Sequence, residues 1–238
     1  MEIKFQILLL SYAIFLLFGI VLQYFITNKK NETMKKNGWL KFIFFNLIIL
    51  SFIVCFYLFP NSLLLFHSLI IIGGSLEVWR LLKNLPSNSK TTISLISISL
   101  FTLFVLGSIK LDNTFLIKTL VSIAVFDGFS QLGGKLIGKR KLAPTISPNK
   151  TWEGFTSGLI VSFLFGICIH IWIDDEFYKT LIFIPFLALT GDLLASFIKR
   201  KAQVKDYSNV IPYQGGFMDR FDSYLFTVSL ITLINFIS

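Results

Sequence analysis

Long apolar runs alternate with short polar stretches along almost the whole chain. A helix needs about 20 mostly apolar residues to cross a bilayer, and about eight such segments can be drawn, with boundaries uncertain by several residues. They begin near Ile7, Leu40, Asn61, Lys90, Thr114, Gly154, Thr180 and Phe221. We therefore predict an all-α fold, a polytopic membrane bundle of about eight transmembrane helices.

Composition agrees with this prediction. Of the 238 residues, 54% are hydrophobic and 15% charged, the mean hydropathy is +0.74, and 27 residues are Phe. A water-soluble chain of this length needs more polar surface. The first apolar run is too long for a signal peptide and has no small-residue cleavage site, so we interpret it as a retained helix. The two cysteines lie in apolar runs and indicate neither a disulfide framework nor a metal site.

The polar connections carry most of the 22 basic residues, and four basic connections fall on one side of the membrane if the helix count is right. The acidic stretch 174–176 falls on the other side. The positive-inside rule makes the basic side cytoplasmic and places both termini outside. The net charge of +9 therefore orients the loops, and we expect no nucleic-acid partner.

Aspartates interrupt the apolar pattern in the second half of the chain. Asp127 lies in the fifth predicted helix and Asp192 in the seventh. Ionisable groups inside a membrane are costly unless they are paired, hydrated or bound to metal. Asp219 and Asp222 share a face at the start of the eighth helix. Four carboxylates at one level suit Mg²⁺ with a substrate phosphate; alternatively, Asp127 and Asp192 pair with basic residues and hold the bundle together.

Glycines and basic residues mark the loop that we predict over 131–153. Lys139–Lys141 and nearby exposed amides suit phosphate, although the loop lacks a Walker A ending; equally, these cations fit a role in topology and headgroup binding. Ser147 before proline predicts a turn. Thr151 is expected to cap the next helix, with Gly154 as its third residue.

The second polar loop is predicted over 199–220. Asp192, Ser196 and Lys199 follow one another at i, i+4 and i+7, so they lie on one stripe of a helix. The stripe leads into a loop that ends in Gly215–Gly216 and the aspartates of the last helix. We interpret the combination as the wall of a site.

These motifs resemble the CDP-diacylglycerol synthase (phosphatidate cytidylyltransferase) family. The family's C-terminal signature is matched in register by Ser196, Lys199, Arg200, Lys205, Asp206, Pro212, Gly215, Gly216, Asp219, Arg220 and Asp222. A second motif is matched by Ser147, Pro148, Lys150, Thr151, Glu153 and Gly154, and an upstream one by Asp127 and Gly138–Lys141. The resemblance covers residues 127–222, and the first hundred residues match only as membrane helices.

The resemblance implies a reaction in which CTP and a lipid phosphate, such as phosphatidate, give a CDP-lipid and pyrophosphate at the cytoplasmic face of the cell (inner) membrane. The implied catalytic residues are Lys150, Lys199, Arg200 and Arg220, and the implied substrate-binding residues are Lys139, Ser147, Ser196, Gly215 and Gly216. The implied ligands of Mg²⁺ are Asp192, Asp219 and Asp222, with Asp127 as a weaker candidate, and a second, monovalent cation stays open. We expect residues 1–113 to be a membrane scaffold or a lipid-entry wall and 114–238 to be catalytic, and related enzymes suggest a homodimer.

Several positions depart from the family pattern. Gln214 replaces a His, Tyr213 a Gly, Ala195 a Glu, and Ser130–Gln131 an Ala-Tyr pair. Gln can hydrogen-bond a phosphate but cannot act as an acid or base. The departures leave open a polyprenyl or ether-lipid phosphate as acceptor, or a non-catalytic homologue. A transporter is disfavoured, because polar residues are concentrated in one half and no inverted repeat stands out.

Overall fold

The computed structural model describes residues 2–28, 31–59, 62–173, 180–211, 213 and 215–237. These residues form the helices α1 (Glu2–Asn28), α2 (Glu32–Leu58), α3 (Ser62–Leu82), α4 (Ser87–Lys110), α5 (Asn113–Ile137), α6 (Trp152–Ile173), α8 (Ile184–Lys201) and α9 (Met218–Ile237). Between α5 and α6 lie two short strands, β1 (Lys141–Ala143) and β2 (Ser147–Thr151). The predicted helical bundle is therefore confirmed, with one small antiparallel hairpin added to it.

Seven helices of the described part are long and apolar enough to cross a membrane. The helix outside this set is α8, which carries Asp192, Lys199, Arg200 and Lys201 within 18 residues. Its charges reflect the polar stripe predicted from the sequence. The chain is thus a membrane protein in which α8 is less apolar than the other helices, because it carries polar and charged residues.

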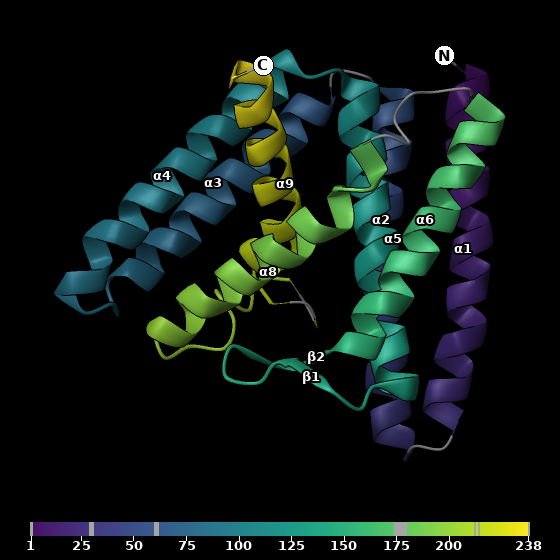
Figure 1. Ribbon diagram of the computed structural model, residues 1–238, viewed down its shortest axis with the longest axis horizontal. Helices are drawn as coiled ribbons and strands as arrows, with labels where there is room; N and C mark the ends of the chain where they lie inside the picture. Colours follow the sequence, from purple (N-terminus) through teal and green to yellow (C-terminus); the bar gives the residue numbers. More distant parts are fainter. Residues whose placement is uncertain are drawn as a thin grey trace.

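The helix ends that border the basic connections lie toward one end of the bundle, the lower end in Figure 1. The end of α1, the end of α3, the β hairpin and the end of α8 all lie there, whereas the start of α1 and the end of α9 lie at the opposite end. This arrangement agrees with the separation of charge inferred from the sequence.

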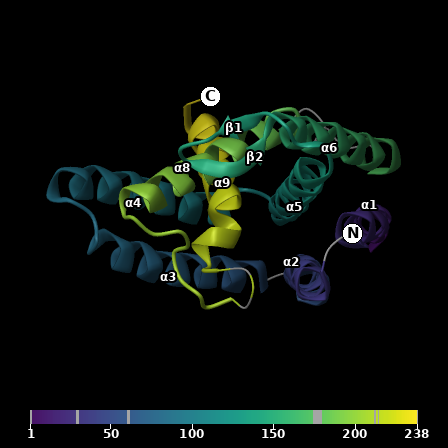
Figure 2. The same ribbon diagram turned by 90° about the horizontal axis from the view of Figure 1, so that it is seen from below.

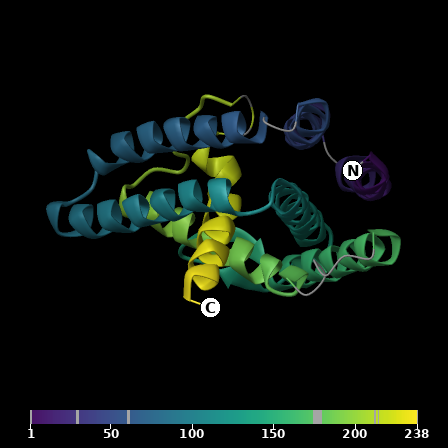
Figure 3. The ribbon, with the colours of Figure 1, turned by 90° about the horizontal axis from the view of Figure 1, so that it is seen from above.

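The helices α5 and α9 lie between the other helices when the bundle is viewed from either end (Figures 2 and 3). The α2 and α3 helices lie on one side of them, and α6 and α8 on the other (Figure 2). Accordingly, 72% of the most apolar window of α5 and 56% of that of α9 are buried, against at most 33% in the other spanning helices. Both central helices carry residues of the predicted site.

Glycines allow α5 and α6 to approach closely. A Cβ atom at Gly158 of α6 would lie 2.7 Å from the carbonyl oxygen of Phe126 in α5, and one at Gly154 would lie 2.6 Å from that of Ser130. Small residues at such contacts let membrane helices pack through backbone atoms. This seam holds α5 against the helix that follows the hairpin.

We expect Gly158→Ala to destabilise the protein, because the added methyl group meets a backbone oxygen that cannot rotate away. Overpacking of this kind costs about 1–3 kcal/mol. Thermal unfolding of purified protein in detergent measures the loss. Gly128→Ala in α5 is the control, since its Cβ would meet only the Phe45 ring, at 3.8 Å. Equal unfolding midpoints for the two variants would contradict the seam.

Candidate active site

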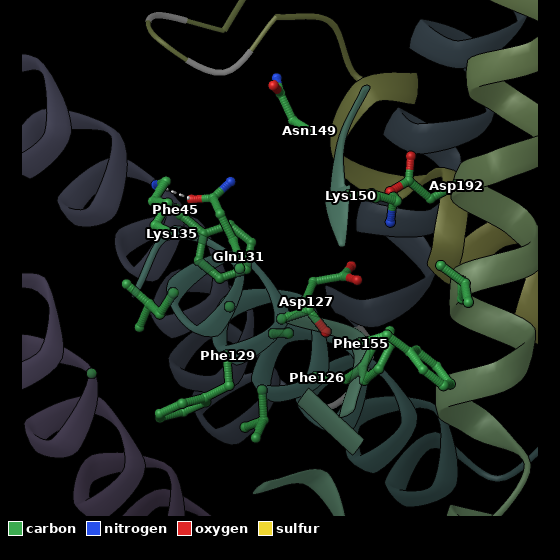
Figure 4. A pocket seen from close by; sticks show the side chains of 18 of the residues that line it. Phe45, Phe126, Asp127, Phe129, Gln131, Lys135, Asn149, Lys150, Phe155 and Asp192 are labelled. Carbon is green, nitrogen blue, oxygen red and sulfur yellow. Dashed lines mark hydrogen bonds and ion pairs between the residues drawn. The ribbon is translucent and has the colours of Figure 1, made fainter. Parts of the chain in front are cut away.

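A cavity of about 690 Å³ lies between α1, α2, α5, α6, α8, α9 and the β hairpin. Its charged wall contains Asp127, Lys150, Asp192, Lys199, Asp219, Arg220 and Asp222. Its apolar wall includes Phe15, Phe42, Phe45, Phe126, Phe129 and Phe155. Figure 4 shows aromatic rings and charged groups bordering one space. The cavity therefore combines groups that suit phosphates with groups that suit hydrocarbon.

The loop before the β hairpin is held by the first turn of α6, which follows the hairpin. The carboxylate of Glu153 accepts hydrogen bonds from the backbone N–H groups of Lys139, at 2.9 Å, and Arg140, at 3.1 Å. The Thr151 hydroxyl accepts one from Gly154 N at 3.1 Å, which confirms the predicted helix cap. These contacts fold the basic loop back and place Lys150 of β2 at the cavity wall.

Lys150 forms an ion pair with Asp192 of α8. The Ser196 hydroxyl donates to the other oxygen of Asp192 at 3.3 Å. The carboxylate of Asp127 in α5 faces this pair in Figure 4. Burial by itself lowers the pKa of Lys150. The nearby carboxylates of Asp192 and Asp127 together raise it by more, so the pKa lies above its ordinary value. Lys150 is therefore a cation that an anionic substrate can meet.

Asp219 is engaged on both oxygens. One accepts from Lys199 Nζ at 2.6 Å, and the other accepts from Tyr207 N at 2.8 Å and Gly216 N at 2.9 Å. The same carboxylate thus neutralises a buried cation and ties down the loop that joins α8 to α9. Although Asp219 borders the cavity, its contacts are those of a residue that organises the loop.

Arg220 and Asp222 follow on the first turns of α9 and border the cavity. Arg220 Nε is buried and has no hydrogen-bond partner among the described residues. Buried donors in proteins almost always have a partner, and a guanidinium pairs well with phosphate oxygens. Asp222 accepts from Ser223 N at 2.7 Å. The guanidinium of Arg220 is therefore a candidate for binding an anion at this part of the cavity.

Thirteen residues were predicted for the site, and the structure brings eight of them to the cavity wall. These are Asp127, Ser147, Lys150, Asp192, Lys199, Asp219, Arg220 and Asp222. The five that do not border it are Lys139, Ser196, Arg200, Gly215 and Gly216. Arg200 instead donates to the carbonyls of Ile146 at 3.2 Å and Val204 at 3.0 Å.

The paired glycines serve the loop itself. Gly215 has a φ of +91°, in the region that favours glycine. A Cβ atom at Gly216 would lie 2.5 Å from a carboxylate oxygen of Glu77. The space that these glycines leave is thus filled by carboxylates of the protein, including that of Asp219 at 2.9 Å from the Cβ position of Gly215.

The carboxylates do not form a complete metal site by themselves. Within the described residues, no group of three or more His, Cys, Asp or Glu side chains is arranged to hold a metal ion. Asp127, Asp192 and Asp222 nevertheless border one cavity and interact electrostatically. Mg²⁺ is commonly bound by one or two carboxylates together with substrate phosphates and water. The oxygen ligands present fit such a shared site.

Two contributions from the first half of the chain were not predicted. Glu77 of α3 contacts the start of α9, and aromatic residues of α1 and α2 line the cavity. A single carboxylate in the apolar run 62–79 was the available signal for Glu77. The aromatic wall gave no comparable signal, because Phe occurs throughout the chain.

Comparison with known proteins identifies the family of this chain. The model of the cytidylyltransferase family matches residues 3–237. The chain belongs to the cytidylyltransferase family. Proteins named phosphatidate cytidylyltransferase are similar to it: that of Rickettsia prowazekii is 30% identical over 227 residues, 88% of this chain and 98% of that protein. That of Rickettsia bellii is 33% identical over 152 residues, 59% of this chain.

The matches differ in how much of each family member they span. The aligned region is 66% of the Rickettsia bellii protein, and 41% of the Staphylococcus saprophyticus phosphatidate cytidylyltransferase. The latter is 42% identical over 106 residues, 42% of this chain. The membership rests on the family model and on the nearly full-length Rickettsia prowazekii match.

The departures from the family pattern fall in different places. Ser130 and Gln131 border the cavity, whereas Ala195 is buried outside it. Tyr213 has a φ of +62°, which explains why glycine suits this position in the family. Its ring lies 5.5 Å from that of Phe44 in α2. Gln214, Pro212 and the acidic stretch 174–176 lie outside the described residues.

Proposed function

We propose that this protein is a cytidylyltransferase that converts CTP and a lipid phosphate, in the first place phosphatidate, to CDP-diacylglycerol and pyrophosphate. One observation carries the proposal: a single cavity of a membrane bundle is lined by six basic side chains, among them Lys150, Lys199 and Arg220, and by a wall of aromatic residues. Nucleotide phosphates need the basic side chains, and a lipid needs the aromatic wall. The names of the relatives agree with this reaction.

The apolar wall supports a lipid acceptor. Phe15 of α1, Phe42 and Phe45 of α2 and Phe129 of α5 border the cavity. Acyl chains that come from the bilayer leave one apolar environment for another, so these side chains accommodate them through van der Waals contacts. The acyl chains enter sideways from the bilayer and leave the phosphate at the charged wall.

In the reaction, an oxygen of the lipid phosphate attacks the α-phosphorus of CTP. The bond from that phosphorus to the oxygen that bridges to the β-phosphate breaks, and pyrophosphate leaves. The nucleophile is already an anion, so the protein has to position the groups and neutralise charge. Lys150, Lys199 and Arg220 supply the cations for this, and Lys150 has a raised pKa, which keeps it protonated at neutral pH.

A divalent cation such as Mg²⁺ would be held by Asp127, Asp192 and Asp222 together with substrate phosphates, and would add positive charge to the triphosphate. Asp219 is left out of this set, because its carboxylate accepts two backbone hydrogen bonds in addition to that of Lys199. Asp192, by contrast, contacts the side chains of Lys150 and Ser196, which can rotate away. The three remaining carboxylates come from three helices, so metal binding would also tie α5, α8 and α9 together.

A different lipid phosphate is the second candidate acceptor. Ser130 and Gln131 stand where the family has Ala-Tyr, and both border the cavity. Ser130 Oγ has no hydrogen-bond partner among the described residues, and Gln131 accepts from Lys135 Nζ at 2.9 Å. Polyprenyl and ether-lipid phosphates are the alternatives to phosphatidate. The extra polar groups favour the ether lipid, which has oxygen atoms near its phosphate, over the polyprenyl phosphate, whose chain is hydrocarbon.

The site is proposed to face the cytoplasm, where CTP is made, since the basic connections lie at the same end of the bundle as the hairpin (Figure 1). This is the side that the positive-inside rule assigns. A homodimer is proposed on the family resemblance alone.

Purified protein with isotope-labelled CTP, Mg²⁺ and a panel of lipid phosphates tests the proposal. We expect labelled CDP-lipid and an equal amount of pyrophosphate, with phosphatidate as the best acceptor. If only a polyprenyl or ether-lipid phosphate gave a labelled product, that lipid would be the acceptor in place of phosphatidate. No product from any lipid would refute the enzymatic function and favour a non-catalytic family member.

A further inference from the structure

The helix α3 contains a buried carboxylate that the proposed reaction does not use. Glu77 is 3% exposed and lies between Leu76 and Val78 in the second half of the helix. One carboxylate oxygen accepts from Ser208 Oγ at 2.5 Å and from Phe217 N at 3.0 Å. The other accepts from Met218 N at 2.9 Å. A carboxylate inside a membrane bundle is costly unless such contacts satisfy it.

These contacts place Glu77 at the N-terminus of α9. The first N–H groups of a helix have no partner within the helix, and they carry the positive end of its dipole. Phe217 N and Met218 N are such groups, and a residue 140 positions earlier in the chain accepts from them. The N-terminus of α9 is thus capped by the Glu77 carboxylate of α3.

The surface of α3 around Glu77 is shaped to receive the start of α9. A Cβ atom at Gly73 would lie 2.9 Å from the Phe217 ring, and one at Gly74 would lie 2.8 Å from the Met218 sulfur. Gly216 in turn leaves space for the carboxylate. Small residues on both sides therefore fix where α9 begins against α3.

The position of this helix start matters for the cavity. Arg220 and Asp222 lie two and four residues beyond Met218 and border the cavity, while Glu77 does not. A shift or fraying of the first turn of α9 would move both side chains. Ser208 adds a second effect, since its bond to Glu77 holds the middle of the loop that joins α8 to α9.

We propose that Glu77 is a positioning residue that fixes the first turn of α9 and thereby places Arg220 and Asp222 in the cavity. The proposal makes the first half of the chain part of the active-site machinery, in addition to a scaffold. Its activity readout rests on the proposed function, whereas its structural readout does not.

The test uses Glu77→Gln, which keeps the shape but turns one acceptor into an NH₂ group that faces a backbone donor. We expect at least a tenfold loss of CTP-dependent pyrophosphate release and faster trypsin cleavage after Lys205, which is exposed in the same loop. Glu32→Gln is the matched control, because the Glu32 side chain is 92% exposed. It should leave both quantities unchanged.

A second measurement separates positioning from general destabilisation. Glu77→Gln is combined with Arg220→Lys, and the two changes should not multiply: Glu77→Gln should cost less than threefold in the Arg220→Lys background. Full multiplication of the two losses would overturn the proposal. So would wild-type cleavage, or wild-type activity, in Glu77→Gln itself.

If Glu77→Gln does not fold, Ser208→Ala replaces it, since this change removes one bond to Glu77 and keeps the charge. It should increase the cleavage rate after Lys205 and lower activity in the same direction, and a wild-type result in both would overturn the proposal. Wild-type protein that releases no pyrophosphate would refute the proposed function alone, because the cleavage rates would still test Glu77.

Discussion

Lys150→Met is expected to lower CTP-dependent pyrophosphate release by at least about 100-fold, the loss typical for removal of one preorganised charge-stabilising group. Lys150 is the cation closest to Asp192, and it interacts electrostatically with Asp127 and Asp222 as well. Without Lys150, the three carboxylates remain beside the triphosphate, and one cation that offsets their charge is lost. Pyrophosphate release at saturating CTP and lipid measures the effect.

The same substitution should destabilise the protein, because it leaves Asp192, whose side chain is 28% exposed, without its ion pair. Removal of one partner costs about 3–5 kcal/mol in a fully buried pair, so the loss for this partly exposed pair should be smaller. A companion variant separates the two effects. Lys150→Met combined with Asp192→Leu removes both charges, and replacement of a buried pair by apolar residues is often neutral for stability. We expect the double variant to recover the unfolding midpoint and to remain inactive.

Lys90→Gln is the control for charge alone, since Lys90 is an exposed lysine of α4, away from the cavity. It should match the wild type in both measurements. Recovery of activity in the double variant would contradict a role of Lys150 in substrate binding, and would leave the pair a purely structural contact.

The sequence was sufficient to predict the helices of this fold, but not the β1–β2 hairpin. Segment length and hydropathy identified the helices, and the charge of the connections predicted which ends lie together, as Figure 1 shows. The largest error was at α2, which begins at Glu32 and not near Leu40. Lys35, Lys36 and Lys41 are therefore helical, because polar residues at a membrane surface can extend a helix that the hydropathy pattern ends early.

The site was predictable where local chemistry determined it. The cap at Thr151 and the stripe of Asp192, Ser196 and Lys199 follow from short-range spacing, and the contacts at Thr151 and between Ser196 and Asp192 are present. Contacts between distant helices were not predictable in the same way. Nothing in the local sequence indicates that Glu77 accepts hydrogen bonds from the start of α9.

Asp219 and Asp222 have different contacts, which their spacing in the sequence did not indicate. Residues three apart share a helical face, so the sequence favoured one role for both. In the structure both border the cavity, but Asp219 accepts from Lys199 and two backbone groups, whereas Asp222 accepts from the adjacent Ser223 N. The distinction depends on the loop that folds over Asp219, which only the tertiary structure reveals.

Asp222→Asn is expected to lower activity by at least about 100-fold while the unfolding midpoint stays at or above that of the wild type. Asp222 lies within electrostatic reach of Asp192 and Asp127, so loss of its charge relieves repulsion between buried like charges. If the three carboxylates share a divalent cation, the residual activity should also require more Mg²⁺. A titration of activity with Mg²⁺ measures this requirement.

Asp219→Asn should behave in the opposite way with respect to stability. It leaves Lys199 buried without its ion pair. Because Tyr207 N and Gly216 N donate to the same oxygen, the new NH₂ group faces either Lys199 Nζ or both backbone donors. Loss of one partner of a buried pair costs about 3–5 kcal/mol, so the unfolding midpoint should fall and trypsin should cleave the loop after Lys205 faster. The Mg²⁺ requirement of any remaining activity should stay that of the wild type. A raised Mg²⁺ requirement with unchanged stability in Asp219→Asn would instead make Asp219 a metal ligand, and would show that its contacts within the protein give way when substrate binds.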